Sequence, residues 1–181
     1  ASAVVPRLTE SDGELRAQTA KILGDAPQAA KAAALALIPL LADAQPRVRL
    51  QAAIALGKLA VPAAVDGLVT LAAKEGMDAV MRHAAVTGLA GCATPGQLAA
   101  FKTHPAVGVR LVAVVALRRW AAPEVSGFLA DTAVEVSEEA VRAIHDDLSI
   151  PAALPALAAL LEKPAERSDA VVRRVLNANF R

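Results

Sequence analysis

The distribution of apolar and polar residues along the chain predicts a series of short amphipathic helices. The clearest is the segment 46–59, PRVRLQAAIALGKL, where Ala52, Ala55 and Leu56 follow Arg49 at intervals of three, six and seven residues. These intervals place the three apolar residues on one face of a helix, and the two alanines allow a second helix to approach closely. Because such a face needs a neighbour, the segment is predicted to be the inner helix of a helical hairpin.

The same pattern occurs six times, and the first residue of each copy is called position zero. The six residues at position zero are Arg16, Arg49, Arg82, Arg110, Ser137 and Asp169. Position +3 holds Thr19, Ala52, Ala85, Ala113, Ala140 and Val172, and position +6 holds Ile22, Ala55, Gly88, Ala116, Ala143 and Val175. Position +7 holds a large aliphatic residue in every copy: Leu23, Leu56, Leu89, Leu117, Ile144 and Leu176.

Successive copies are separated by 33, 33, 28, 27 and 32 residues, which suits a pair of short helices. The sequence therefore predicts an all-α fold, a right-handed α-solenoid of about six helical hairpins that forms a single domain over residues 1–181.

Prolines mark the start of the outer helix in most hairpins. They lie six or seven residues after position +7: Pro62, Pro95, Pro123 and Pro151. Proline is favoured in the first turn of a helix because its missing N–H is not needed there. Pro39 and Pro155 instead lie inside predicted outer helices, where we expect a kink or a late helix start.

Acidic residues recur in the turn before an inner helix. Asp43 lies six residues before Arg49, and Asp131 lies six residues before Ser137, so both are predicted to cap the helix that follows. The equivalent place before Arg110 holds His104, which keeps a turn but loses the carboxylate.

The composition fits closely packed helices and offers no strong overall charge. The chain is 55% hydrophobic but has only three Phe, one Trp and no Tyr, and its formal net charge is +1. This balance gives no overall field that would attract nucleic acid or anionic lipid. The longest stretch without Lys, Arg, Asp or Glu, 83–101, contains Pro95 and three glycines, so membrane insertion is not expected.

A single cysteine, Cys92, excludes an internal disulfide and a Cys-rich metal site. The chain begins without Met, and Arg181 ends it within a predicted helix. We therefore expect the sequence to be a segment of a longer protein.

The runs VRLQAAIALGKL, MRHAAVTGLAG, VRLVAVVALRRW and VSEEAVRAIHDDL resemble HEAT repeats, in particular the short bacterial kind grouped with phycobilin-lyase HEAT-like repeats. The resemblance covers almost the whole chain and implies an α-solenoid. Because repeats of this kind are mostly interaction surfaces, it implies a fold more specifically than a function.

A narrower resemblance rests on RRVLNANFR at 173–181 and on the run KILGD. It is similar to the HEAT segment of large bacterial proteins that join a dehydrogenase-like propeller to a c-type haem domain. This resemblance implies a spacer or docking region of an exported, periplasmic protein. The CxxCH motif that would hold the haem is missing, because Cys92 is followed by Ala-Thr-Pro-Gly.

The arginines at position zero would form a basic ladder in a stacked array. Such a ladder could hold an acidic peptide. The favoured interpretation is structural: each arginine pairs with the carboxylate of the preceding turn and with neighbouring carbonyls, and so joins one repeat to the next. The candidate partner-binding residues are Arg49, Arg82, His83, Arg110, Arg118 and Arg119.

Arg118 and Arg119 precede the only tryptophan, Trp120, and together they could anchor a partner. Trp120 stands at position +10, where other copies carry Leu59 and Cys92, so we expect a packed indole. The two arginines would remain available to solvent.

The sequence contains no pattern typical of catalysis, and we predict no catalytic, cofactor-binding or metal-binding residue. His145, Asp146 and Asp147 are metal-ligand types, but three successive helical residues point in different directions. There is no HExxH motif, and no serine lies in a G-x-S-x-G setting.

These observations predict a non-catalytic protein-interaction or spacer scaffold within a larger multidomain protein. Its partner would be another protein or other domains of the parent chain, and dimerisation through an open C-terminal repeat is a further expectation. We expect no nucleic-acid partner and no cofactor. The alternative is an enzyme, either a HEAT-like lyase that handles a ligand or a DNA-repair enzyme, that uses the concave groove of the solenoid.

Overall fold

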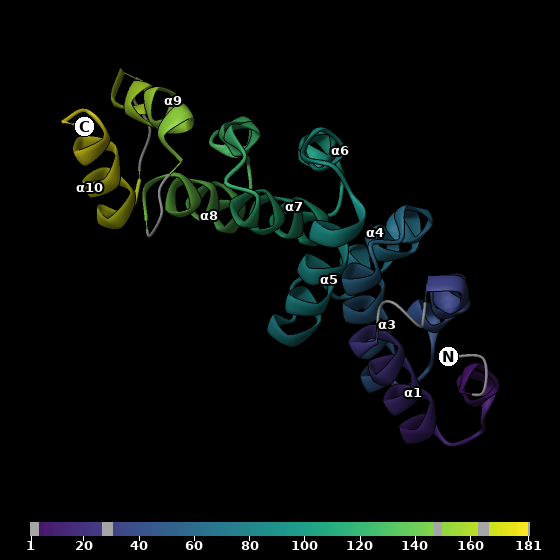
Figure 1. Ribbon diagram of the computed structural model, residues 1–181. Coiled ribbons are helices and arrows are strands. Elements are labelled where there is room, and N and C mark those ends of the chain that lie inside the picture. The colour runs from purple at the N-terminus through teal and green to yellow at the C-terminus, as the bar shows by residue number, and fades with distance from the viewer. Residues whose placement is uncertain (1–3, 27–30, 147–149, 163–166, 181) are drawn as a thin grey trace. The chain divides into compact units, whose positions relative to one another are not determined.

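The computed structural model describes residues 4–26, 31–146, 150–162 and 167–180. Within these ranges the regular structure is entirely helical (Figure 1). The chain divides into two compact units, Ala1–Thr94 and Pro95–Arg181, which are called unit 1 and unit 2. Each unit is described by itself, and the prediction of a single domain over residues 1–181 stays a prediction.

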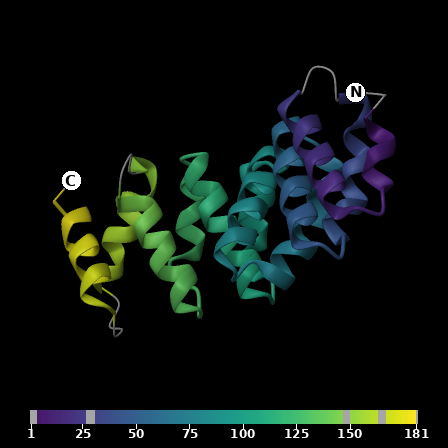
Figure 2. The same ribbon diagram turned by 90° about the horizontal axis from the view of Figure 1, so that it is seen from below.

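Unit 1 is built from three inner helices with short helical elements along one side (Figures 1 and 2). The inner helices are α1 (Gly13–Asp25), α3 (Pro46–Leu59) and α5 (Ala79–Cys92). The outer elements are the 3₁₀ helices η1 (Val5–Thr9), η2 (Lys31–Ala42) and η3 (Pro62–Ala64), and the α-helix α4 (Val65–Glu75).

Unit 2 repeats this arrangement with three more inner helices. They are α7 (Val107–Arg119), α8 (Val134–His145) and α10 (Asp169–Ala178). The outer elements are α6 (Pro95–Ala100), η4 (Phe101–Thr103), η5 (Pro123–Phe128), η6 (Pro151–Ala153), α9 (Leu154–Ala158) and η7 (Ala159–Glu162). Each copy of the sequence pattern is therefore an inner helix, and the predicted all-α solenoid class is confirmed.

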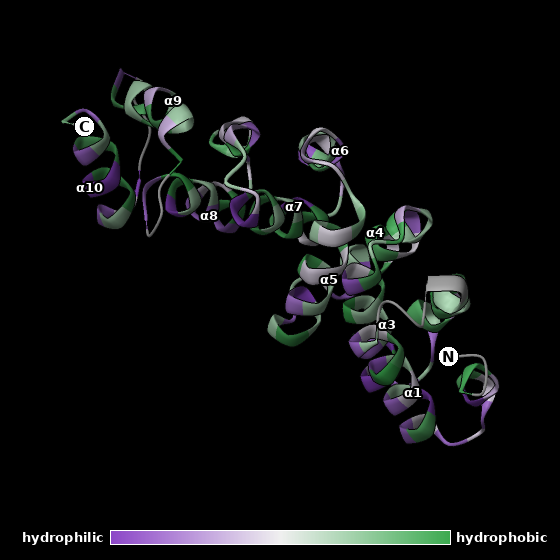
Figure 3. Cartoon of the chain, viewed as in Figure 1, coloured by the Kyte–Doolittle hydropathy of each residue, from purple (hydrophilic) through white to green (hydrophobic). Residues whose placement is uncertain are grey.

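The predicted stacking face is buried in the first five copies. Every residue at positions +3 and +7 of these copies is buried, and Leu56, Leu89, Leu117 and Ile144 are completely so. Figure 3 shows the accompanying mixture of hydrophobic and hydrophilic residues around inner helices such as α3. Burying the aliphatic face of each helix while leaving the other face in water is the main source of stability in such an array.

One expectation of this pattern is wrong in the first copy, because Ile22 at position +6 is 53% exposed. The neighbouring Gly24 packs on Ala55 of α3. Two residues along a helix turn the side chain by about 200°. Ile22 therefore lies on the face of α1 that points away from α3.

The register of the last copy is also wrong by one residue. Val172 and Leu176, predicted at +3 and +7, are each 41% exposed, whereas Val171, Val175 and Ala178 are buried. Positions +3 and +7 are buried when position zero is Ser168 instead of Asp169, although position +6 is then Arg174. Adjacent valine and leucine residues both satisfy an aliphatic requirement at +7, so the sequence pattern alone did not separate the two registers.

Glycines allow the inner helices of unit 1 to approach closely. A Cβ added at Gly57 of α3 would overlap the carbonyl oxygen of Thr87 in α5, and one added at Gly91 would overlap the carbonyl oxygen of Gly57. Backbone therefore packs directly on backbone between α3 and α5. This contact requires glycine at both positions.

The prolines act as predicted in the outer elements, with one difference. Pro62, Pro123 and Pro151 each begin a 3₁₀ helix, and Pro155 accompanies a late start, because α9 begins at Leu154 after η6. Pro39 lies inside η2, which is a 3₁₀ helix over its whole length and not a kinked α-helix.

Two inner helices end on an alanine in the left-handed region, Ala60 with φ 52° and Ala121 with φ 49°. The next residues close each end, since the N–H of Val61 donates to Leu56 O and that of Ala122 donates to Leu117 O. We predict that Ala60→Gly and Ala121→Gly each raise the free energy of unfolding by about 0.5–1 kcal/mol, because glycine adopts this conformation without strain. Urea unfolding of each variant measures the change, and a loss of stability would contradict the prediction.

Candidate functional site

The arginines at position zero share one set of main-chain acceptors. In each, Nη1 donates to the carbonyl oxygens six and five residues earlier in the chain. The distances are 2.7 and 2.9 Å for Arg16, 2.8 and 3.0 Å for Arg49, 3.5 and 3.1 Å for Arg82, and 2.8 and 3.2 Å for Arg110. These bonds fix each guanidinium group against the turn that precedes its inner helix.

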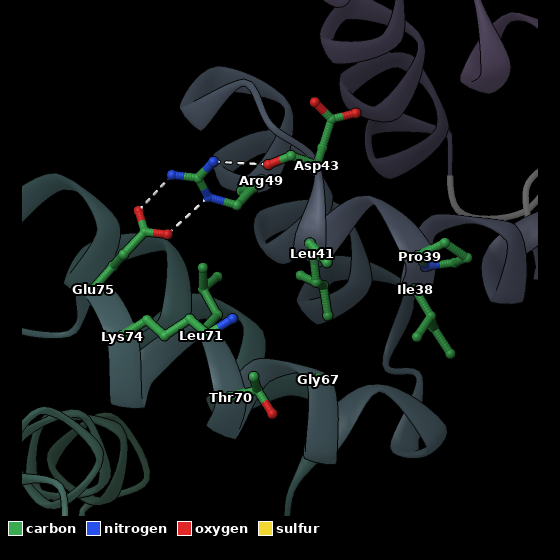
Figure 4. Close-up of a pocket in the computed structure, with 11 residues that line it drawn as sticks. Ile38, Pro39, Leu41, Asp43, Arg49, Gly67, Thr70, Leu71, Lys74 and Glu75 are labelled. Carbon is green, nitrogen blue, oxygen red and sulfur yellow. Dashed lines mark hydrogen bonds and ion pairs between the residues drawn. The ribbon is translucent and has the colours of Figure 1, made fainter.

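Three of these arginines also bind a carboxylate at the end of their own outer element. Arg16 pairs with Asp43 at 2.8 and 2.9 Å, and Arg110 pairs with Asp131 at 2.7 and 3.0 Å. In Arg49, Nη2 donates to Glu75 Oε2 at 2.8 Å, and Nε lies 2.8 Å from Oε1 (Figure 4). Each guanidinium group thus ties the start of an inner helix to the end of the outer element that follows it. We call this arrangement the arginine staple.

The structural interpretation of the ladder therefore needs one correction. The bonds to neighbouring carbonyls were predicted, but the carboxylate comes from the following turn and not from the preceding one. Asp43, for example, offers its main-chain carbonyl to Arg49 and its side chain to Arg16. Partner binding by Arg49 or Arg110 stays a prediction, since both guanidinium groups are engaged within their hairpins.

The predicted capping role of the turn acids is also wrong. The carboxylate of Asp43 accepts from the N–H of Gln45, and that of Asp131 accepts from the N–H of Ala133, at 2.8 Å in each case. Gln45 and Ala133 are themselves the N-cap residues of α3 and α8, so the acids order the turn instead of capping the helix. At the equivalent place before α7, His104 Nδ1 accepts from the N–H of Ala106 at 3.1 Å, so the turn is kept without a carboxylate.

Arg82 differs from the other three arginines because no carboxylate among the described residues pairs with it. Its neighbour His83 is exposed on α5. Arg82, His83, Arg118 and Arg119 are therefore the candidate partner-binding residues that lie outside the three arginine staples. Arg118 is half-buried and donates to Glu139 at 3.4 Å.

The predicted packing of Trp120 is wrong, because its side chain is 53% exposed. The helix α7 ends at Arg119, and the left-handed Ala121 turns the chain away immediately afterwards. Position +10 therefore falls outside the helix, and the helical spacing that predicted a packed indole does not apply.

The group of His145 and Asp146 is a structural ion-pair site. The carboxylate of Asp146 accepts from Arg174 Nε at 2.8 Å and from Nη2 at 2.6 Å, which joins α8 to α10. The guanidinium group of Arg174 lowers the pKa of Asp146, and burial opposes the change. Asp147, the third residue of the predicted group, lies outside the described residues. No cluster of three or more metal-ligand side chains occurs in the part of the chain that the structure describes.

The staples should make unit 1 sensitive to acid. The bonds from Arg16 lower the pKa of Asp43 below its ordinary value of 3.8. A lowered carboxyl pKa contributes stability above the ordinary value, and this stability is lost as the pH falls through the lower value of the folded state.

We predict that Asp43→Asn lowers the free energy of unfolding by about 1–3 kcal/mol at pH 7, where the charged hydrogen bonds are complete. The difference between the variant and the original chain should shrink as the pH falls below 3.8 and through the lower pKa of the folded state, because Asp43 then becomes protonated and loses its charged bonds. Urea unfolding at pH 7, 4 and 2 measures the difference. A gap that stays constant with pH would contradict the assignment.

The inner-helix surface of unit 1 carries charged pairs between neighbouring helices. Lys58 of α3 and Lys21 of α1 both donate to Asp25, at 2.6 Å, and together they lower its pKa to about 2. At the other end of the same helices, Arg47 Nε lies 2.9 Å from Glu14 Oε2. The side chains of these ion pairs are exposed, so the pairs contribute little to the stability of the folded chain.

A groove opens on this surface between the first turns of α3 and α5. Its volume is about 540 Å³, and its lining residues are Pro46, Arg47, Leu50, Glu75, Asp78, Val80 and Met81. Val80 is 60% exposed, although it is aliphatic. The two acids hold structural bonds, since Glu75 binds Arg49 and Asp78 caps α5 through the N–H groups of Val80 and Met81. The groove therefore combines an apolar wall with an ordered polar rim.

A second pocket of about 380 Å³ lies beside the staple of Arg49 (Figure 4). It is lined by the ends of η2 and α4, including Leu41, Leu71 and Lys74. None of the helices in the described ranges is long and apolar enough to cross a membrane.

Comparison with known proteins agrees with this architecture. Residues 1–90 match the family model of HEAT repeats. No curated protein sequence matches the chain.

Several solved structures have a similar fold. The complex of CpcE and CpcF of phycocyanin lyase from Nostoc sp. PCC7120 has a TM-score of 0.55 at 24% identity, covering 98% of this chain and 92% of that chain. An engineered protein has a TM-score of 0.51 at 20% identity, covering 97% of this chain and 93% of that chain. At these identities the likeness is one of fold. Residues 1–90 are therefore HEAT repeats, and the whole described chain has the helical-hairpin fold of an α-solenoid.

Proposed function

We propose that the chain is a non-catalytic scaffold that binds a protein partner through the inner-helix surface of unit 1. The observation that carries the proposal is the groove between α3 and α5, where Val80 and Leu50 present aliphatic surface beside charged residues. An apolar centre within a polar rim is the usual organisation of a protein-interaction surface.

The packing beneath the groove supports this role. Direct backbone contact at Gly57 and the staple of Arg49 hold α3, α4 and α5 in one arrangement. A surface that is already ordered loses little conformational entropy when a partner binds. A stiff array of this kind also suits a spacer within a larger exported protein, which is the finer role that we propose from the resemblance of 173–181.

The alternative of a lyase or DNA-repair enzyme would require side chains placed for chemistry in a groove. Glu75 and Asp78 are the acids of the groove in unit 1, and both are used in structural bonds. The fold shared with phycocyanin lyase is compatible with many functions, so it does not favour the alternative.

The test compares partner capture by three forms of the full chain. Val80→Glu places a charge in the groove, and Leu35→Glu is the matched control, because Leu35 is 63% exposed on the outer element η2. Proteins captured from an extract of the source cells by the original chain should be retained by Leu35→Glu and lost by Val80→Glu. Equal capture by both variants, with equal circular dichroism spectra, would refute the inner-helix surface as the binding site.

A further inference from the structure

Arg82 of α5 is held on the turn before its helix in the same way as the arginines of the three staples. Its Nη1 donates to the main-chain carbonyls of Gly76 and Met77, at 3.5 and 3.1 Å. These carbonyls lie six and five residues earlier in the chain, at the positions that accept from Nη1 in every staple. The same main-chain bonds therefore orient this guanidinium group, and the residue is half-buried.

The other edge of this guanidinium group has no carboxylate. In each staple, Nε and Nη2 together hold the two oxygens of one side-chain carboxylate. Within the described ranges, no group accepts a hydrogen bond from Nε or Nη2 of Arg82. We call these two donors the open fork of Arg82. The three other arginines at position zero have their forks occupied.

The sequence explains why the fork is open. The carboxylates of the staples lie six or seven residues before the next position zero: Asp43, Glu75 and Asp131. The residues six and seven places before Arg110 are His104 and Thr103, and neither side chain is acidic. The repeat of Arg82 therefore keeps the arginine but lacks the acid that would balance its charge.

The acid nearest to Arg82 in the sequence does not fill the fork. Asp78, four residues earlier, caps α5, and its carboxylate accepts from two N–H groups of the first turn at 3.0 and 2.9 Å. The first repeat has the same arrangement, because Asp12 caps α1 four residues before Arg16. Arg16 nevertheless holds Asp43 through both donors of its fork, at 2.8 and 2.9 Å. A capping acid at this position is therefore compatible with a second carboxylate on the arginine.

Apolar side chains are exposed in the same turn and at the start of the same helix. Met77, whose carbonyl accepts from Arg82, is 52% exposed, and Val80, which lines the groove, is 60% exposed. A partner that covers these side chains would also exclude water from the neighbouring charge. A charged hydrogen bond is stronger where water is excluded.

We propose that the open fork of Arg82 binds the carboxylate of an aspartate or glutamate side chain of the protein partner. Nε and Nη2 would each donate to one carboxylate oxygen, as they do in the staple of Arg16. An acidic side chain is favoured over a chain end, because all three staples use side-chain carboxylates. This inference rests on the proposed function, since it assumes a protein partner, and it adds the chemistry that the partner must carry.

The probe for this site is N-acetyl-glutamate methylamide, titrated into the ¹⁵N-labelled full chain and followed by NMR of the arginine Nε–H signals. N-acetyl-glutamine methylamide is the matched neutral probe, because it has nearly the same shape and lacks the charge. We expect a saturable shift of the Arg82 signal with the glutamate probe, and about tenfold weaker binding of the glutamine probe. The signals of Arg16 and Arg110 should not shift, because Asp43 and Asp131 occupy their forks.

Two variants complete the test. Arg82→Lys keeps the charge but removes the fork, so the glutamate probe should bind about tenfold more weakly, as measured at the backbone amides of 76–83. Arg173 is the matched control, because it is exposed on α10 and its Nε donates to the carbonyl of Asp169 in its own helix. Arg173→Lys should leave the titration of Arg82 unchanged.

Several outcomes would overturn the proposal. They are equal binding of both probes, binding at Arg82 that is no tighter than at Arg173, binding that survives Arg82→Lys, and no binding. N-acetyl-alanine carries the carboxylate of a chain end, and tighter binding of this compound would overturn the assignment to an acidic side chain.

The result is independent of the capture experiment with Val80→Glu. Carboxylate binding at Arg82 without partner capture through the groove would leave this site standing and refute the proposed binding surface. Capture through the groove without carboxylate binding would do the reverse.

Discussion

Replacing Arg110 by alanine should lower the free energy of unfolding of unit 2 by about 4 kcal/mol. The side chain of Arg110 is only 10% exposed, and that of its carboxylate partner Asp131 is 5% exposed. Removing the guanidinium group leaves a buried carboxylate and the carbonyls of His104 and Pro105 without their donor. Breaking one side of a buried ion pair typically costs about 3–5 kcal/mol, because the remaining charge is neither solvated nor paired.

Urea unfolding followed by Trp120 fluorescence measures this change, since Trp120 is the only tryptophan and lies in unit 2. Arg110→Lys should retain part of the stability, at a cost of about 2 kcal/mol, because an ammonium group cannot serve all the acceptors. Arg142→Ala is the control in the same unit. Its contact with Glu139 is half exposed, so the expected cost is less than about 1 kcal/mol. Equal effects of the Arg110 and Arg142 substitutions would show that the staple contributes little.

The arginine staple could be predicted only in part from the sequence. Its main-chain acceptors lie at a constant five and six residues before the arginine, so local spacing is enough to find them. Its carboxylate lies 27, 26 or 21 residues after the arginine, because the outer elements differ in length and in their content of 3₁₀ helix. Because this separation varies, the sequence shows no repeating distance between the arginine and its acid. The pattern therefore favours the acid of the preceding turn, which is nearer in the sequence.

The inner helices themselves were predictable because helical spacing and prolines agree on their limits. The structure places α3 at Pro46–Leu59, the range that the pattern predicts. The errors occur at helix ends and in the last repeat. Trp120 follows a left-handed turn that no residue type announces, since alanine occupies it, and α10 offers two aliphatic residues for one position.

The groove between the first turns of α3 and α5 could not be predicted from the pattern of apolar residues. It depends on which side chains fail to fill the space between the two helices. Three of the arginines at position zero bind a carboxylate within their own hairpin, so we propose that a partner is recognised by other residues, such as Val80.

Replacing Gly57 by alanine should destabilise unit 1 by about 2–3 kcal/mol, although alanine is the better helix former by about 1 kcal/mol. The added methyl group would overlap the carbonyl oxygen of Thr87 and lie 2.9 Å from the Cα of Gly88. These are backbone atoms within α5, so they cannot move unless α3 and α5 separate. Separation would remove the contact that holds the two walls of the groove together, and partner capture through Val80 should weaken as well.

Gly67→Ala is the matched control within unit 1. Its methyl group would meet Leu41 Cδ1 at 2.8 Å, the end of a flexible side chain that can rotate away. The gain in helix propensity should offset this small cost, so stability is expected to change by less than about 1 kcal/mol. Hydrogen exchange at the amides of α3 and α5 measures both variants, and faster exchange is expected only for Gly57→Ala. If Gly57→Ala left exchange unchanged or slowed it, the inner helices would not be held at backbone contact, and the stiffness on which the scaffold proposal relies would have no basis.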